Sequence, residues 1–292
     1  TIVSDQNPLF KDLRKLLTGR GIRKQGQALV SGEKLVAEVL AAHPGCCRAW
    51  VGRPDQPPPD TAAHLPWYQL APELLRELDL FGTRAPLLLI RFPDLRPWTP
   101  SEGFPPGASV IIPFQDPENV GAAIRSAAAF GAAQAVLLAE SAHPFHPKAL
   151  RASGGAALSL PLRQGPALAA GSPELPLLAL SAEGADIRQA ALPAAFGFMA
   201  GLEGPGLPPS WRSRAVRIPI RPEVESLNAA AAVAVALYEW RRRTGQQGCC
   251  HGPSRTDEPD PFGSIAGPRR RLPLPGKRRR LLRRLLRALQ LR

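Results

Sequence analysis

The stretch DPENVGAAIRSAAAFGA, residues 116–132, directly follows the apolar run ASVIIPF, residues 108–114. A short apolar run that passes through a polar turn into alanine-rich sequence is typical of a buried strand followed by a helix. Helix capping accounts for Asn119, but neither capping nor packing accounts for Arg125 among Ala, Ile and Ser. Ligands of open α/β sheets bind at the carboxyl ends of the strands, and a guanidinium suits phosphate. The stretch therefore predicts both a fold and a binding site.

The pattern of a strand followed by a helix recurs through residues 108–244. Five short runs are apolar throughout, as is typical of parallel strands covered on both faces: SVIIPF, QAVLLAE, PLLALSAE, FGFMAGLE and AVRIPI. Helical sequence lies between them at 119–131, 146–153 and 227–243. These segments predict an α/β domain with a doubly wound parallel sheet over residues 108–244.

Residues 1–94 predict a separate, smaller α/β sandwich. The first 24 residues are basic and carry leucines at helical spacing, and ALVSGEKLVAEVLAA indicates a strand, a turn and a helix. A further helix is predicted in APELLRELDLF and a closing buried strand in PLLLIRF. The proline-rich segment 95–107 predicts a linker without regular structure.

Most of the net charge of +13 lies after residue 240, where 15 Lys and Arg accompany three acidic residues. The composition of residues 245–292 predicts a disordered basic tail, and we expect its charge to attract RNA phosphate. Two alternatives stay open for this tail: a solvated extension without a function, and attachment of residues 277–292 to an anionic membrane.

Several classes of protein and site are disfavoured. The adjacent pairs Cys46–Cys47 and Cys249–Cys250 lack the spacing of a zinc site, so we expect reduced thiols and no metal. Neither a G-x-G-x-x-G fingerprint nor a Walker A loop is present. No apolar run reaches the ~18 residues that a membrane span needs, and no signal peptide is recognisable. We therefore expect a cytoplasmic protein that does not enter the membrane.

Two further segments place polar residues after predicted strands. GFMAGLEGPGL, residues 197–207, surrounds Glu203 with glycines, which permit close approach of the backbone to a ligand. IPIRPEVESLN, residues 218–228, carries Ser226 and Asn228 into a long alanine-rich helix, with Ser226 as a candidate N-cap. Both segments are candidates for the same site as residues 116–132.

Four motifs in order resemble the SpoU family of S-adenosylmethionine-dependent RNA ribose methyltransferases, within the SPOUT class. They are D-P-x-N-x-G-x-x-x-R at 116–125, K-x-x-x-x-S-x-G-A within 147–162, G-x-E-G-x-G-L at 201–207, and I-P followed by V-E-S-L-N within 218–228. The resemblance implies a SPOUT-type sheet with a deep C-terminal trefoil knot. It also implies that residues 1–94 form a small ribosomal-protein-like α/β sandwich that binds the RNA substrate, and that the protein is a homodimer with each active site at the dimer interface.

The resemblance also assigns the site residues. Arg125 is implied to be the catalytic residue beside the target ribose, surrounded by Asn119, Glu203, Ser226 and Asn228. S-adenosyl-L-methionine is implied to contact Leu180, Ala200, Gly201, Ile218, Ile220 and Leu227. A guanidinium keeps its proton up to a pH above ~12, so we expect Arg125 to orient ribose and phosphate and leave a role as base open. Leu202 departs from the polar residue usual before Glu203, and we expect activity with altered local hydrogen bonding.

The implied reaction is methyl transfer to a ribose 2′-hydroxyl of structured RNA, with rRNA as the first choice of substrate. A tRNA ribose methyltransferase stays open, as does a non-catalytic RNA-binding or ribosome-assembly protein that keeps the fold. The V-E-S-L-N block argues against methylation of a base.

Overall fold

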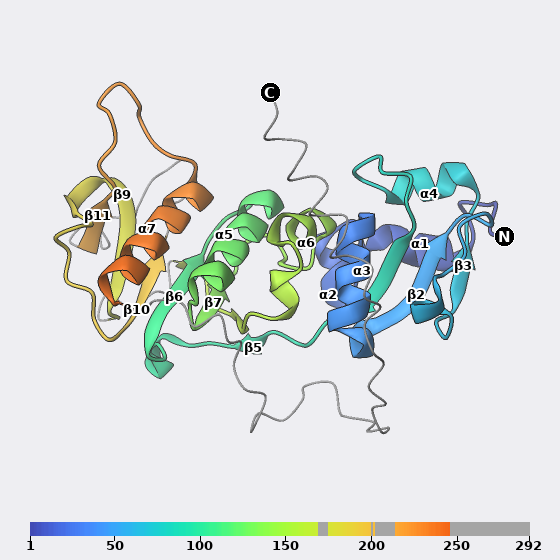
Figure 1. The fold of residues 1–292 in the computed structure, drawn as a ribbon, viewed down its shortest axis with the longest axis horizontal. Coiled ribbons are helices and arrows are strands. Elements are labelled where there is room, and N and C mark those ends of the chain that lie inside the picture. Colours follow the sequence, from blue (N-terminus) through green and yellow to red (C-terminus); the bar gives the residue numbers. More distant parts are fainter. Residues whose placement is uncertain (169–174, 200, 202–213, 246–292) are drawn as a thin grey trace, which may run out of the picture. The chain divides into compact units, whose positions relative to one another are not determined.

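The computed structural model describes residues 1–168, 175–199, 201 and 214–245, which form two β-sheets with helices packed against them (Figure 1). The smaller sheet has four strands in the order β1-β4-β2-β3, and the larger has seven in the order β11-β9-β10-β6-β7-β8-β5. Both sheets belong to the same compact unit.

The four-stranded sheet has helices on both faces. Its strands are β1 (Gln27–Val30), β2 (Cys47–Gly52), β3 (Trp67–Gln69) and β4 (Leu87–Arg91). Its helices are α1 (Pro8–Lys15), α2 (Gly19–Gln25), α3 (Glu33–Ala42) and α4 (Pro72–Leu78). Strand β4 is antiparallel to β1 and β2, whereas β2 and β3 are parallel. Leucines of α1 and α4 pack on Leu29, Leu87 and Leu89, while Val36 and Leu40 of α3 adjoin Trp50 on the opposite face.

The sequence predicted β1, α3, α4 and β4 but missed β2 and β3. Exposed Arg48 interrupts the apolar pattern of β2, and β3 has only three residues. The basic segment at the start is divided into two helices rather than one. The first helix ends at Lys15, and Thr18 caps the second, since its hydroxyl accepts the N–H of Gly21 at 3.2 Å. Cys46 and Cys47 are buried free thiols at the start of β2.

The seven-stranded sheet is parallel in every recorded pair. Its strands are β5 (Arg96–Pro97), β6 (Gly107–Ile112), β7 (Gln134–Leu137), β8 (Leu162–Gln164), β9 (Leu177–Asp186), β10 (Ala195–Met199) and β11 (Ala215–Arg217). The five apolar runs are β6, β7, β9, β10 and β11, so the prediction of a parallel sheet is confirmed. The proline-rich segment 95–107 is partly regular, contrary to expectation, because its edge strand β5 tolerates Pro97.

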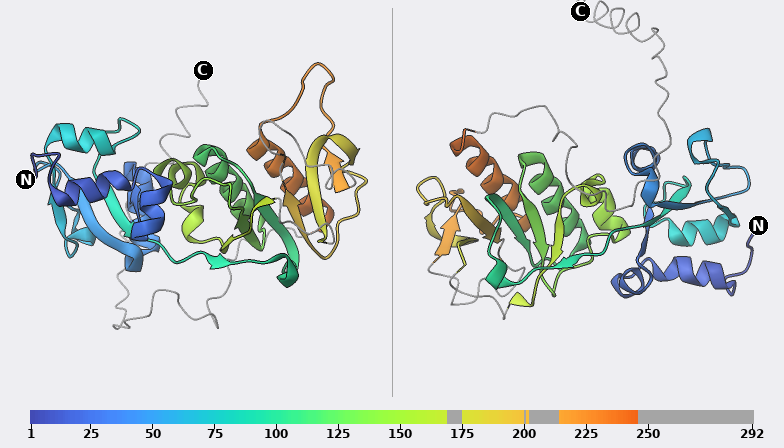
Figure 2. Two further views of the ribbon diagram at one scale, coloured as in Figure 1. Left: turned by 180° about the vertical axis from the view of Figure 1, so that it is seen from behind. Right: turned by 90° about the horizontal axis from the view of Figure 1, so that it is seen from below.

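The helices of the larger sheet form a single layer, with α5 (Pro117–Phe130) between α6 (Pro147–Ser153) and α7 (Ala229–Arg243) (Figure 2). The opposite face is covered, among the described residues, by side chains from loops. Trp98, Phe104, Leu168 and Leu175 pack there on Ile111 and Met199. The expectation of a doubly wound sheet with helices on both faces is therefore not met within the part of the chain described.

Helices α5 and α6 run side by side in the same direction. Glu118 of α5 faces Lys148 of α6 at 3.7 Å between Oε1 and Nζ. One turn on, a Cβ placed on Gly121 would lie 2.3 Å from the carbonyl oxygen of Ala149. Such a contact is not possible, so only glycine allows the two helices to approach this closely.

Helix α6 and the loop before it also contact the smaller sheet and its helices. The rings of Phe92 and Phe145 stack with centroids 4.2 Å apart, and the His146 Nε2 lies 3.1 Å from the carbonyl oxygen of Leu17. The Arg151 guanidinium lies over the Phe81 ring at 4.1 Å. We call this set of contacts the joint.

His143 is buried within the joint beside the rings of Phe92 and Phe145, and its Nδ1 accepts the N–H of Phe145 at 3.3 Å. Burial, followed by the charges of Arg23 and His146, lowers the pKa of His143 to about 4. In the unfolded chain this group titrates near 6.5. The folded state therefore binds the proton less readily, and stability is lost as the pH falls from about 6.5 towards 4.

We predict that His143 lowers the free energy of unfolding by about 2 kcal/mol between pH 7 and pH 5. His143→Asn should remove this part of the pH dependence, because an Asn side chain accepts the N–H two residues on without titrating. Urea unfolding at pH 7, 6 and 5 measures the effect, with the exposed His64→Asn as the control. Equal pH dependence in the wild type and His143→Asn would contradict the assignment.

Candidate active site

The start of α5 positions Asn119 at the carboxyl end of β6. The Asp116 carboxylate caps the helix by accepting the N–H of Glu118 at 3.0 Å, and Pro117 occupies the first helical position. Capping by Asn119, which the sequence suggested, is therefore wrong. Asp116 performs that function and Asn119 lies within the first turn.

Asn228 caps α7 and forms a hydrogen bond with Asn119. Its Oδ1 accepts the N–H of Ala231 at 3.1 Å, which fixes the orientation of the amide. Its Nδ2 is then free to donate to the Oδ1 of Asn119 at 3.0 Å. This hydrogen bond joins the first and the last of the four motifs. Ser226, the N-cap suggested by the sequence, is an exposed loop residue instead.

Arg125 lies farther along α5, on the side that faces α6. It is exposed, and its guanidinium carbon is 3.7 Å from the position that a Cβ on Gly154 would take, at the end of α6. Six residues separate Asn119 from Arg125, a rise of about 9 Å along a helix. Helix α5 therefore presents Asn119 to α7 and Arg125 to α6, rather than both to one neighbour.

Three of the predicted cofactor positions lie in or directly after three adjacent strands. Leu180 is a buried residue of β9, Gly201 follows β10, and half-buried Ile218 follows β11. A Cβ on Gly201 would lie 3.2 Å from the carbonyl oxygen of Leu180. The backbones of two strand ends are thus in close contact where the sequence placed a ligand.

Strand β9 leaves regular pairing at the same point. Ala179 pairs with Ala215, but the next residue of β11, Val216, pairs with Ala185. Residues 180–184 come between these two pairs. At Gly184, where φ is 141°, a Cβ would lie 2.4 Å from the carbonyl oxygen of Ala215. The excursion of β9 therefore begins at a predicted cofactor contact and ends at a position that requires glycine.

Ile220 and Leu227 are each 37% exposed in the loop between β11 and α7. Ala200, Leu202 and Glu203 lie outside the described residues.

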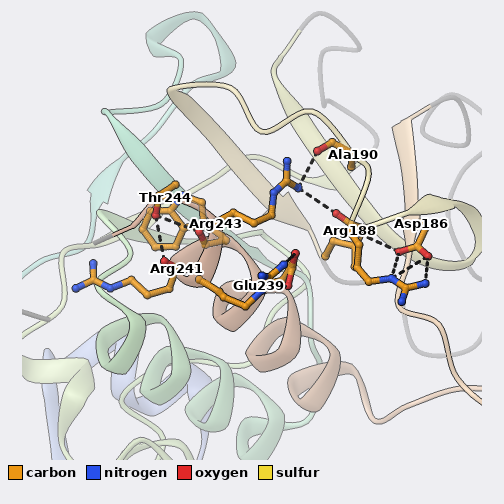
Figure 3. A network of polar contacts seen from close by, with 10 residues as sticks. Asp186, Arg188, Ala190, Glu239, Arg241, Arg243 and Thr244 are labelled. Atoms are coloured by element: carbon orange, nitrogen blue, oxygen red, sulfur yellow. Dashed lines mark hydrogen bonds and ion pairs between the residues drawn. The ribbon is translucent and has the colours of Figure 1, made fainter. Parts of the chain in front are cut away.

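A polar network that the sequence analysis missed fixes the far end of α7 (Figure 3). The Arg243 Nη1 donates to the carbonyl oxygens of Ile187 at 3.2 Å and Ala190 at 2.8 Å, in the segment after β9. Asp186 accepts from the Arg188 side chain, which lowers the pKa of Asp186 to about 2. The only signal in the sequence is an acid two residues before an arginine. The network holds the helix that Asn228 caps at its other end.

None of the described helices is long and apolar enough to cross a membrane. The described residues also contain no group of three or more His, Cys, Asp or Glu side chains arranged to hold a metal ion.

Comparison with known proteins identifies the family of this chain. Residues 109–238 match the model of the SpoU rRNA methylase family. A protein of Synechocystis named as an uncharacterized tRNA/rRNA methyltransferase is 32% identical over 83% of this chain and 94% of its own length. The chain belongs to the SpoU methylase family. The α/β fold with a parallel sheet is shared with the SpoU methyltransferase AviRb from Streptomyces viridochromogenes in complex with AdoMet. That structure has a TM-score of 0.68 and 25% identity, over 82% of this chain and 98% of the other.

A more similar relative from Syntrophobacter fumaroxidans is 60% identical over 84% of this chain. It is named ribosomal RNA small subunit methyltransferase G 2, and the present chain spans only about half of its length, 50%. The name describes a protein of about twice the matched length, so it does not assign an activity to the present chain.

The hydrogen bond between Asn228 and Asn119 is testable through stability. Asn228→Ser keeps a good N-cap but is too short to reach Asn119, whereas Asn228→Ala loses both contacts. We predict that Asn228→Ala lowers the free energy of unfolding by about 1 kcal/mol more than Asn228→Ser. Denaturant unfolding measures both. In a double-mutant cycle of Asn228→Ser with Asn119→Ala, a coupling of about 0.5–1 kcal/mol is expected, and strict additivity would contradict the bond.

Proposed function

We propose that this protein transfers a methyl group from S-adenosyl-L-methionine to a ribose 2′-hydroxyl of RNA, with rRNA as the substrate. The observation that carries the proposal is the hydrogen bond between Asn119 and Asn228. It unites two motifs from different strands at the carboxyl edge of a parallel sheet, where open α/β sheets bind their ligands. Membership of the SpoU family and the names of the related RNA methyltransferases support the same activity.

Residues within β9 and directly after β10 and β11 suit the cofactor. Leu180 and Ile218 offer apolar side chains, and the missing side chain of Gly201 exposes backbone groups beside the Leu180 carbonyl. Apolar walls with a few placed polar groups are usual for sites of this kind. The related AviRb was crystallised with AdoMet, in support of this assignment. We assign Ala200, Ile220 and Leu227 as further contacts, and we propose the deep C-terminal trefoil knot that the family resemblance implies.

When bound beside Leu180, Gly201 and Ile218, S-adenosyl-L-methionine would supply an electrophilic methyl group for the ribose 2′-oxygen, with a neutral thioether as the leaving group and the hydroxyl proton passing to solvent. Arg125 would hold an RNA phosphate and the target ribose, since a planar guanidinium binds phosphate in two places. Because that guanidinium does not give up its proton near neutral pH, we assign it orientation and charge stabilisation. Asn119 and Asn228 fix the first turn of α5, and Glu203 and Ser226 complete the proposed site.

Residues 1–94 are proposed to be the ribosomal-protein-like domain that binds the RNA, joined through 95–107 to the methyltransferase domain at 108–244.

We predict that Arg125→Ala abolishes methyl transfer while leaving the free energy of unfolding and cofactor affinity unchanged. Arg125→Lys should fail as well, because a point charge does not reproduce the planar fork. The assay is incorporation of labelled methyl groups into ribosomal RNA from a strain that lacks the gene, with cofactor binding followed by calorimetry. Arg76→Ala, which removes another exposed helical arginine, is the control. Near-normal turnover of Arg125→Ala would refute the site.

A second copy of the chain is proposed to complete the site. Arg125 and Asn119 face different helices, and five exposed apolar side chains lie on α7 and the loop before it: Ile220, Val224, Leu227, Val235 and Tyr238. Exposed apolar side chains gathered in one region mark an interaction surface. A homodimer through this face would bury them and bring further residues to the cofactor edge.

We predict a homodimer by light scattering at micromolar concentration. Val235→Arg should give a monomer without methyl transfer activity, because a charge would be buried at the interface. The control is Val3→Arg, at an exposed valine far from α7 in sequence, which should stay dimeric. A monomeric wild type, or a dimeric Val235→Arg, would exclude this interface.

A further inference from the structure

The charge of the folded part of the chain is segregated toward its first residues. Residues 1–26 contain six Lys and Arg and two Asp, whereas residues 27–240 contain 16 Lys and Arg and 19 Asp and Glu. The near-neutral balance of residues 1–240 therefore conceals a basic segment, which comprises α1 and α2.

Part of this charge is already neutralised, and part is not. On α1, Lys15 pairs with Asp12 at 2.8 Å and Arg14 pairs with Glu77 at 3.3 Å. On α2, Arg20, Arg23 and Lys24 are all exposed, and none of them forms an ion pair with a carboxylate among the described residues. Three cations of α2 are thus left for an external partner.

Helix stability explains only two of these cations. Arg23 and Lys24 occupy the last turn of α2, where a positive charge is favourable with the helix dipole. Arg20 occupies the first turn, where a positive charge is unfavourable by the same argument. Packing does not require Arg20 either, because it is exposed, so its position points to a contact outside the chain.

The cations continue across the joint onto α6. A Cβ on Gly19 would lie 3.6 Å from the Arg23 Nη2 and 3.7 Å from the His143 Cβ, so Arg23 borders the joint. Within the joint, the His146 Nδ1 accepts the N–H of Lys148 at 3.2 Å. Lys148 has one carboxylate nearby, Glu118 at 3.7 Å, and Arg151 lies exposed over Phe81. Helix α6 then ends at Gly154, beside the guanidinium of Arg125.

We propose that Arg20, Arg23 and Lys24 of α2, with Lys148 and Arg151 of α6, form one surface that binds the RNA backbone across the joint. We call these five residues the joint surface. The inference rests on the proposed function and specifies where the RNA lies: its phosphates follow α2 and α6 toward Arg125. Cations that neutralise phosphates release counterions, which gives affinity without sequence specificity and leaves selection of the nucleotide to the site.

The same cations suit an anionic membrane less well. A helix that binds the surface of a membrane inserts an exposed apolar face. The apolar face of α1 and α2 is already used, since Phe10, Leu13, Leu16 and Ile22 are each at most 2% exposed. RNA, which needs only the cations, is the partner that this surface fits.

The test compares Arg20→Gln/Lys24→Gln and Lys148→Gln/Arg151→Gln with the wild type in the full-length protein. The matched control is Lys34→Gln, at a lysine of α3 whose side chain is 90% exposed and 3.8 Å from Glu38. Affinity for fluorescein-labelled fragments of ribosomal RNA is measured across a salt series. Each double variant should bind at least about tenfold more weakly, with a slope of log K against log salt that is smaller by about two. Binding of S-adenosyl-L-methionine should match the wild type in both double variants, as should thermal unfolding of Arg20→Gln/Lys24→Gln.

Each outcome decides one proposal. If the wild type binds neither S-adenosyl-L-methionine nor RNA, the proposed function is wrong. If the wild type binds both, and the double variants bind RNA as tightly as Lys34→Gln, the joint surface is wrong while the function stands. Loss of binding to phosphatidylserine vesicles with unchanged RNA affinity would assign the surface to lipid instead. Loss in the α2 variant alone would restrict the surface to α2 and overturn its continuation across the joint.

Discussion

The contact between Gly121 and the main chain of Ala149 sets the position of the central helix, on which both halves of the candidate site depend. Because the side chain of residue 121 is absent, α5 and α6 lie close together at this point. Helix α5 then presents Asn119 toward α7 and Arg125 toward the end of α6. An alanine there would overpack the interface, at a cost of about 1–3 kcal/mol, and would also shift the two functional side chains. Packing and chemistry are thus specified by the same glycine.

Much of the larger sheet was predictable because its buried strands are continuous apolar runs, as in β6 and β7. The elements that were missed lack this signal. Strand β8 carries Arg163 and Gln164, and β5 consists of an arginine and a proline at the edge of the sheet. Within the described residues, the face opposite α5 differs from the prediction for a related reason. Apolar residues on both sides of a strand show that both faces are covered, but they do not distinguish a helix from loop side chains such as Trp98.

The candidate site was predictable to the extent that it depends on strand ends. The carboxyl ends of parallel strands share one edge, so Asn119 and Asn228 were expected to lie close together, as were Leu180 and Gly201. Helix geometry predicts that Arg125 and Asn119 lie apart, but we did not infer this separation from the motif. Asn119 faces α7 and Arg125 faces α6 because of how the helices pack. The continuity of cations from α2 to α6 also depends on packing. Neither is written in a local pattern of sequence.

The stack of Phe92 on Phe145 has a consequence for how the molecule opens. Phe92 directly follows β4, the strand that pairs with both β1 and β2, and Phe145 lies just before α6. Units of local unfolding usually coincide with contiguous supersecondary motifs. Here two such motifs share a buried aromatic pair. Local unfolding of either motif therefore exposes an aromatic ring of the other to water. Amide protons of β4 and α6 should then exchange with solvent in one cooperative step, and weakening the smaller sheet would loosen the helix beside Arg125.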